Sequence, residues 1–119
     1  MQHVFISYSR RDSDIMRVVR DRLRAAGFNV WTDENLEIGT HDWTVAIEDA
    51  LSNSCAVVAL LSPDAKSSRW VEKELTFAVE NEVPIRPLLV RGNQNNSVPF
   101  LLINVQYIDA RQDLNGALT

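Results

Sequence analysis

An aromatic ring and a carboxylate lie one helical turn apart near the middle of the chain, at Trp70 and Glu74. The segment 67–80 that holds them repeats its apolar residues at helical spacing, in a stripe formed by Val71, Leu75, Ala78 and Val79. Trp70, Glu74 and Phe77 form a second stripe about 100° around the axis, which predicts Glu74 at the margin of the buried face. Such a ring can stack on a flat ligand while the carboxylate acts on its charge. A simpler interpretation, which this segment alone favours, is an amphipathic helix with Trp70 as a core anchor and Glu74 as a boundary charge.

The amino-acid composition limits the classes of protein to which the chain can belong. Hydrophobic residues make up 45% and charged residues 24% of 119 residues, which predicts one ordinary globular domain. A net charge of −4 argues against a nucleic-acid partner, because such binding depends on neutralising phosphates. The longest apolar run, 56–61, is far shorter than the ~20 residues of a membrane span, and residues 1–6 lack the basic start of a signal peptide. We therefore expect a cytoplasmic protein without a membrane or nucleic-acid partner.

The elements that position Trp70 and Glu74 follow from strand and helix patterns that alternate along the chain. Strands are expected at 4–8, 28–31, 56–61, 83–90 and, more weakly, 105–108. Helices are expected after 12–14, where Asp12, Ser13 and Asp14 are capping candidates, from 43 to 51, and around Trp70. Gly27 is expected to end the first helix. This alternation predicts an α/β fold with a five-stranded parallel sheet.

Smaller features complete the prediction. The run 56–61 does not alternate in polarity, which indicates a strand covered on both faces, and Cys55 before it is expected to be a small core residue. Ser62, Pro63 and Asp64 are typical of a helix cap and first turn. Residues 92–97 are expected to form a polar loop, and residues 111–119 a helix cut off near its start.

Three loops leave the carboxyl ends of the expected strands, where parallel sheets bind ligands. They begin at Ser9 and Arg10, at Asp33 to Gly39, and at Ser62. Because the helix with Trp70 follows the third loop, its first turns can face the same crevice. This convergence favours a functional role for Glu74.

Several kinds of chemistry are absent from the sequence. The four glycines, at positions 27, 39, 92 and 116, fit neither a P-loop nor a dinucleotide-binding motif. His3, His41 and Cys55 have no spacing that suggests a metal site. A phosphoacceptor receiver domain has acidic residues after its first strand and an aspartate closing its third, where this chain has Ser7-Tyr8-Ser9 and Leu61-Ser62. We therefore expect no metal and no cofactor.

With these residues assembled, the chain closely resembles a Toll/interleukin-1 receptor (TIR) domain of the bacterial, NAD-consuming kind. Four segments carry the resemblance: the first-strand box at 4–9, the second strand and BB loop at 31–39, the third-strand box at 60–63, and the WxxxE motif at 70–74. The resemblance implies a flavodoxin-like sheet of strand order 2-1-3-4-5 with helices on both faces. It covers residues 1–119 as one TIR domain, expected to come from a longer multidomain protein.

The resemblance also implies an activity. In catalytic TIR domains the WxxxE glutamate, here Glu74, is essential for cleaving the nicotinamide–ribose bond of NAD⁺, which is a substrate and not a cofactor. Nicotinamide departs as a neutral molecule, so no general acid is required, unlike in ordinary glycosidases. A single carboxylate can stabilise the oxocarbenium-like ribose that remains.

The remaining site residues follow from the same resemblance. Trp70 would line the pocket and stack on a ring, and Asp33 would shape the entrance. The first loop would contact the nucleotide and its phosphates, and the BB loop would form a wall, through Tyr8, Ser9, Arg10, Leu36, Glu37 and Gly39. Trp43 is expected to be a core or lid-packing residue. Simpler roles stay open: Tyr8 can finish a strand, Asp33 can cap its loop, and Trp70 can be core.

Two functions remain open at this point. The first is an NAD⁺ glycohydrolase that can also form a cyclic ADP-ribose isomer, activated by self-association of TIR domains in bacterial antiphage immunity. A sensor or oligomerisation domain on the same longer chain would trigger it. The alternative is a non-catalytic adaptor that recruits other TIR domains through the BB loop and helix surfaces.

Overall fold

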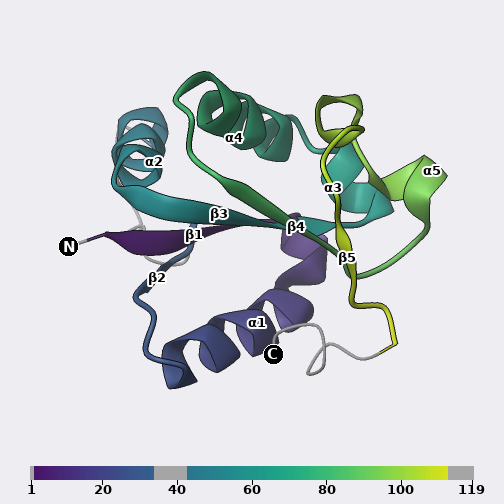
Figure 1. Ribbon diagram of the computed structural model, residues 1–119, viewed down its shortest axis with the longest axis horizontal. Coiled ribbons are helices and arrows are strands. Elements are labelled where there is room, and N and C mark those ends of the chain that lie inside the picture. The colour runs from purple at the N-terminus through teal and green to yellow at the C-terminus, as the bar shows by residue number, and fades with distance from the viewer. Residues whose placement is uncertain (1, 34–42, 113–119) are drawn as a thin grey trace.

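A single parallel sheet organises the molecule, and the computed structural model describes residues 2–33 and 43–112 of it. Its strands are β1 (His3–Ser7), β2 (Val30–Trp31), β3 (Ser54–Leu61), β4 (Ile85–Leu89) and β5 (Ile108–Asp109). They pair in the order β2-β1-β3-β4-β5, all parallel (Figure 1). The helices are α1 (Ser13–Ala25), α2 (Trp43–Ser52), α3 (Pro63–Ser67), α4 (Arg69–Glu80) and α5 (Gln94–Ser97), with 3₁₀ turns η1 (Arg10–Asp12) and η3 (Phe100–Leu102). The predicted α/β class, strand number and strand order are confirmed.

Helices cover both faces of the sheet. In Figure 1, α1 lies on one face, and α2 and α4 lie on the other. Side chains of β3 alternate between two apolar clusters, with Val57, Ala59 and Leu61 on the side of α2 and α4. Val58 and Leu60 pack on the side of α1. The central strand is therefore buried on both faces, as its unbroken apolar run predicted.

Gly27 ends α1, as predicted, and the reason is its backbone conformation. Its φ of +96° lies in the left-handed region that glycine tolerates. There the N–H of Gly27 donates to the carbonyl of Arg24, and the N–H of Phe28 donates to that of Leu23, at 3.0 and 3.1 Å. This pattern satisfies the last carbonyl groups of α1 in a Schellman motif. Phe28 is thus part of the helix end, and β2 begins only at Val30, later than predicted.

Two other strand boundaries differ from the sequence prediction. β4 begins at Ile85, where its register with Val57 of β3 starts. Pro84 has no N–H to donate and contributes only its carbonyl, which accepts from the N–H of Val57 at 2.8 Å. β5 comprises Ile108–Asp109 in place of 105–108, since Val105 closes a turn onto Leu102. β5 pairs only with Leu88 and Leu89, so Pro87 lies in β4 beyond the end of its short neighbour.

The expected polar loop at 92–97 contains the helical turn α5. Asn93 and Asn96 form a reciprocal capping box, with backbone-to-side-chain hydrogen bonds of 2.8 and 2.9 Å. This local pairing stabilises a helical turn in a polar segment, where the sequence has no apolar periodicity that would predict a helix.

The prediction that Cys55 is a core residue is wrong, since the side chain is exposed. Cys55 lies at the amino end of β3, before the part of the strand that helices cover on both faces. Within the described residues, no helix is long and apolar enough to cross a membrane. The helix expected at 111–119 falls largely outside the described residues.

Candidate active site

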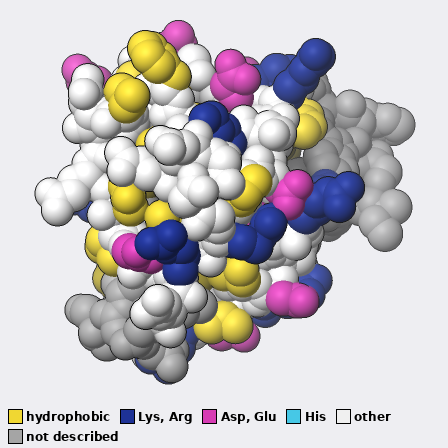
Figure 2. Space-filling view, turned by 90° about the vertical axis from the view of Figure 1, so that its right-hand side faces the viewer, with side chains coloured by type: hydrophobic (Ala, Val, Ile, Leu, Met, Phe, Trp, Pro, Cys, Tyr) yellow, Lys and Arg dark blue, Asp and Glu magenta, His cyan; other side chains and the backbone are white. Residues whose placement is uncertain are grey.

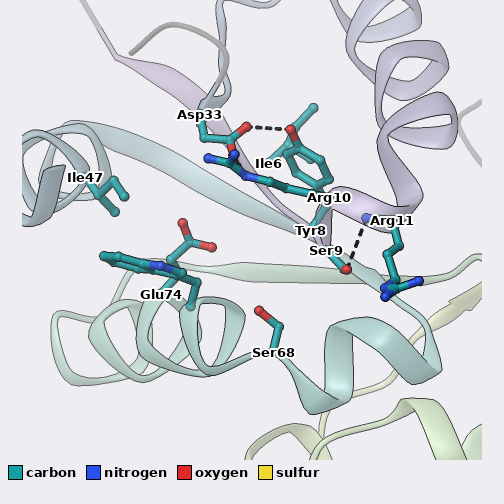
Figure 3. Close-up of a pocket in the computed structure, with 10 residues that line it drawn as sticks. Ile6, Tyr8, Ser9, Arg10, Arg11, Asp33, Ile47, Ser68 and Glu74 are labelled. Atoms are coloured by element: carbon teal, nitrogen blue, oxygen red, sulfur yellow. Dashed lines mark hydrogen bonds and ion pairs between the residues drawn. The ribbon is translucent and has the colours of Figure 1, made fainter. Parts of the chain in front are cut away.

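A cavity of about 300 Å³ opens beside the carboxyl end of β1. Figure 3 shows its walls coming from β1 and the turn after it, the end of β2, α2 and the start of α4. The lining residues are Ile6, Tyr8, Ser9, Arg10, Arg11, Asp33, Ile47, Ser68, Trp70 and Glu74. Segments far apart in the chain therefore meet at the edge where a parallel sheet is expected to bind its ligand.

Two serine caps set the position of α4 in this wall. Ser62 caps α3, accepting a hydrogen bond from the N–H of Ala65 at 3.1 Å, with Pro63 in the first turn, as predicted. Ser68 caps α4, accepting from the N–H of Val71 at 3.3 Å. Because α4 begins at the cavity, its first two turns carry Trp70 and Glu74 to the cavity wall.

Glu74 is buried more deeply than the helix pattern predicted. Its exposure is 8%, so it lies inside the wall and not at the margin of the buried face. The Oγ of Ser7, at the end of β1, donates to Oε1 of Glu74 at 2.8 Å. Burial raises the pKa of Glu74 to about 8, the hydrogen bond from Ser7 opposes that rise, and the negative charge of Asp33 adds to it. A carboxyl group with so perturbed a pKa inside a cavity is a candidate for chemistry.

Trp70 is not a core anchor, because 46% of its surface is exposed. The ammonium group of Lys73 lies 5.3 Å from the centre of a Trp70 ring, within the range of a cation–π contact. Trp70 also lines the cavity, so part of its ring faces the same space as Glu74. The simpler interpretation of the helix as a plain amphipathic element is therefore wrong for both residues.

The loop after β1 and the end of β2 meet through Asp33. The hydroxyl of Tyr8 donates to Oδ1 of Asp33 at 2.5 Å, and Nε of Arg10 lies 3.4 Å from Oδ2. Both contacts lie between residues on the cavity wall, as Figure 3 shows for Tyr8 and Asp33. Asp33 thus links two segments of the wall and places the guanidinium of Arg10 beside the cavity.

A second group of charged side chains, formed by Asp12, Asp64 and Arg91, lies next to the η1 turn. Asp12, one of the three predicted capping candidates, is the N-cap residue of α1, but its side chain makes no capping bond. Its carboxylate instead accepts from Ser62 Oγ at 2.5 Å and from Arg91 Nε at 3.0 Å. Arg91 also pairs with Asp64, which lies 3.8 Å from Nε of Arg11. Figure 2 shows basic and acidic side chains interleaved on this side of the molecule.

The structure brings together the predicted site residues that it describes. Tyr8, Ser9, Arg10, Asp33, Trp70 and Glu74 all line the one cavity. Leu36, Glu37 and Gly39 lie outside the described residues, as does the side chain of Trp43. The sequence analysis missed Ser68, Ile6 and Ile47 on the wall, and Ser7 beside Glu74. Arg11, which forms a local basic spot with Arg10 in the sequence, also lines the cavity. The polar side chain of Ser7 within an otherwise apolar strand pattern was the sequence signal that could have identified this residue.

The arrangement combines three chemical elements. A buried carboxyl group can stabilise positive charge, an indole can stack on a ring, and guanidinium groups can bind phosphate. Together they fit a ligand that has an aromatic base, a site of developing positive charge and an anionic part.

Comparisons with known proteins agree with this fold. Among curated proteins, the 2' cyclic ADP-D-ribose synthase BtTIR of Bacteroides thetaiotaomicron is 37% identical over 81 residues, which are 66% of this chain and 28% of that protein. The matched part of the chain thus spans less than a third of the length of that relative.

Solved structures of TIR proteins superpose on most of the chain. The TIR domain of the Toll-related receptor TRR-2 from Hydra magnipapillata has a TM-score of 0.80 at 23% identity, covering 92% of this chain and 85% of that chain. A metazoan TIR-STING receptor from C. gigas has a TM-score of 0.82 at 25% identity, covering 98% and 37%. A family model of the TIR domain matches residues 4–118, and on that match the chain belongs to the TIR domain family.

Proposed function

We propose that this chain cleaves the nicotinamide–ribose bond of NAD⁺, with Glu74 as the catalytic residue. The observation that carries the proposal is a buried carboxyl group, 8% exposed, on the wall of a cavity that an exposed tryptophan and two arginines also line. BtTIR, to which part of the chain is similar, is named a cyclic ADP-ribose synthase, and this supports a reaction on NAD⁺.

The reaction needs one carboxylate. The bond between ribose C1 and the pyridinium nitrogen breaks, and its electron pair leaves with neutral nicotinamide. The positive charge passes to the ribose as an oxocarbenium-like species, which the carboxylate of Glu74 stabilises by its charge. An oxygen of water or of a hydroxyl group then bonds to C1 and releases its proton to solvent. If that oxygen belongs to water, the product is ADP-ribose; if it belongs to the same molecule, the product is a cyclic isomer.

The raised pKa of Glu74 fits a cationic substrate. With a pKa of about 8, the carboxyl group is mostly protonated at neutral pH before NAD⁺ binds. The positive nicotinamide ring beside it favours the ionised form. Binding of the cation therefore produces the carboxylate that the next step uses, and a proton leaves to solvent.

Further parts of the proposal concern contacts and context. Trp70 stacks on a ring of the substrate, Tyr8, Ser9 and Arg10 contact the nucleotide and its phosphates, and Asp33 shapes the entrance. The BB-loop residues Leu36, Glu37 and Gly39 complete the wall. Self-association of TIR domains, driven by a sensor or oligomerisation domain, activates the enzyme in bacterial antiphage defence.

The test measures the release of nicotinamide from NAD⁺ by chromatography. The protein is used at high concentration or fused to an oligomerising tag. We expect release by the wild type and a fall of at least 100-fold in Glu74→Ala and Glu74→Gln, since one well-placed electrostatic group contributes about 10²–10³ in rate. The product peaks separate ADP-ribose from a cyclic isomer. No release by folded, clustered wild type would overturn the proposal.

One observation favours the adaptor as a second candidate function. The segment between β4 and β5 exposes an apolar cluster, at 84% for Phe100, 40% for Leu101, 60% for Ile103 and 39% for Val105. Exposed apolar clusters are typical of association surfaces. In an adaptor, association through this cluster would persist in Glu74→Ala, and nicotinamide release would be absent from the wild type as well.

A further inference from the structure

Ser7 occupies a position where the strand pattern calls for an apolar side chain. In β1, Phe5 and Ser7 point to the same face of the sheet, because side chains alternate along a strand. Phe5 packs in the apolar cluster with Leu75 of α4. Ser7 has no exposed surface, so its hydroxyl would be costly to bury without a hydrogen-bond partner.

Glu74 supplies that partner. Ser7 Oγ donates to Oε1 of Glu74 at 2.8 Å, and within residues 2–33 and 43–112 Ser7 is the only hydrogen-bond partner of the Glu74 carboxyl group. Ser7 is itself fixed, since it lies in register with Ala59 of the central strand β3. The contact therefore ties the carboxyl group on α4 to β1, an inner strand of the sheet that pairs on both sides.

We propose that Ser7 is the positioning residue for Glu74: its hydroxyl holds Oε1, stabilises the ionised carboxylate, and leaves Oε2 for the ribose of the substrate. This inference rests on the proposed cleavage of NAD⁺ for its link to activity. Figure 3 shows the carboxyl group of Glu74 directed from α4 toward the side of the cavity formed by Arg10 and Asp33.

The charges around Glu74 explain why such a residue is needed. Asp33 faces the cavity from the end of β2 and disfavours a second negative charge. Tyr8, Arg10 and Arg11 face it from the turn after β1, and Tyr8 and Arg10 already contact Asp33. Among the described residues, α2 and β3 contribute no titratable side chain to the wall. The hydroxyl of Ser7 is thus the group that opposes the effect of burial on the pKa of Glu74.

The first experiment follows the carboxyl carbon of Glu74 by ¹³C NMR during a pH titration, with Glu74→Gln to assign the signal. In Ser7→Ala we expect the midpoint to rise by roughly one pH unit, because a hydrogen bond to a charged group is lost. Ser54→Ala is the matched control: Ser54 is also a buried serine of the sheet, but it donates to the carbonyl of Ala50. An unchanged midpoint in Ser7→Ala would overturn the inference.

Ser7→Cys keeps the shape of the side chain and a weak donor, so it serves if Ser7→Ala does not fold. Its midpoint should rise by less than one unit, and no rise would again count against the inference. These titrations need no turnover. If the wild type releases no nicotinamide, the proposed function fails while the NMR result still decides the role of Ser7.

The second experiment records kcat/KM against pH. Ser7→Ala should be about 10-fold less active than the wild type at pH 7 and should recover most of that loss at pH 9, when its carboxyl group is also ionised. A loss of the same size at every pH would indicate only a structural role and would overturn the inference.

Discussion

At the scale of the single residue, the proposed function depends on how burial changes the acidity of Glu74. The WxxxE spacing places a carboxyl group beside an aromatic ring, but spacing alone gives it no special acidity. The raised pKa of about 8 arises because α4 and β1 enclose the side chain and Asp33 adds a second negative charge. Two consequences can be measured.

The first consequence concerns activity. Because kcat/KM reports the ionisation of the free enzyme, it should rise about tenfold per pH unit below pH 8 and level off above it. The pH profile of kcat should level off at lower pH, since the cationic substrate favours the carboxylate. Initial rates of nicotinamide release between pH 5.5 and 9.5 test this expectation. They are compared only at pH values at which circular dichroism shows that the chain is folded. A kcat/KM that falls as pH rises through 8 would instead indicate a protonated general acid.

The second consequence concerns stability. The folded chain keeps the Glu74 proton between pH 4.5, the ordinary pKa of a glutamate, and the raised pKa of about 8, where the unfolded chain loses it. The stability that this proton contributes is therefore complete below pH 4.5 and is lost as pH rises through about 8. Glu74→Gln has no such loss, so its free energy of unfolding relative to the wild type should rise by about 4 kcal/mol between pH 5 and pH 9.

Urea unfolding of the two proteins at pH 5, 7 and 9 tests this expectation. The comparison of variants at each pH removes the contributions of all other titrating groups. A difference in free energy of unfolding that stays constant from pH 5 to pH 9 would contradict the raised pKa. Glu72→Gln, an exposed carboxylate on the same helix, is the matched control.

At the scale of the element, charged side chains join the ends of three strands. Asp12 follows β1, Ser62 follows β3 and Arg91 follows β4, and hydrogen bonds of 2.5 and 3.0 Å connect the carboxylate to the other two. The side chain of Asp12 is 1% exposed, whereas that of Arg91 is 42% exposed. The group fixes η1, which carries Arg10 and Arg11 to the cavity.

Arg91→Ala should destabilise the fold by roughly 2 kcal/mol, because it leaves the buried carboxylate of Asp12 without its counter-charge. Arg86→Ala, at an exposed arginine of β4, is the matched control and should change the free energy of unfolding by less than about 0.5 kcal/mol. Urea unfolding measures both. In the double variant Asp12→Ala/Arg91→Ala the loss should be smaller than the sum of the single losses; an additive result would show that the two groups do not interact.

At the scale of the whole molecule, the cavity and the exposed apolar cluster lie in different places. The cavity opens at the carboxyl end of β1, whereas Phe100, Leu101, Ile103 and Val105 lie between β4 and β5. One chain can therefore present the candidate active site and the exposed apolar cluster at the same time. The proposed activation by self-association requires a reaction site and an association surface that do not overlap.

Phe100→Ser/Ile103→Ser should reduce self-association at high concentration without unfolding the chain, since both side chains are exposed. Sedimentation velocity measures association, and nicotinamide release should lose its dependence on protein concentration in the same variant. Val18→Ser, at an exposed apolar residue of α1 on the other side of the sheet, should change neither. Association that persists unchanged in the double variant would exclude this cluster as the association surface.

The sequence by itself determined the layers and the residues that meet. The unbroken run in β3 required helices on both faces, and the loops after β1, β2 and β3 had to converge because parallel strands end at one edge. Strand direction thus predicted that the loops and the start of the Trp70 helix converge, and the resemblance to TIR domains selected Tyr8, Ser9, Arg10, Asp33, Trp70 and Glu74 there. The structure brings these residues together. Periodicity and strand direction are local properties, which a single sequence carries.

Only the tertiary structure decided the burial and the electrostatic surroundings of those side chains. Helix spacing placed Glu74 at a margin and allowed Trp70 as core, but the fit of α4 against β1 buries the first and leaves the second exposed. The side chain of Asp12 does not cap α1, because it instead pairs with Arg91, a charged partner 79 residues away in sequence. Burial and charge pairing arise from contacts between segments distant in the chain, and those contacts set the acidity of Glu74.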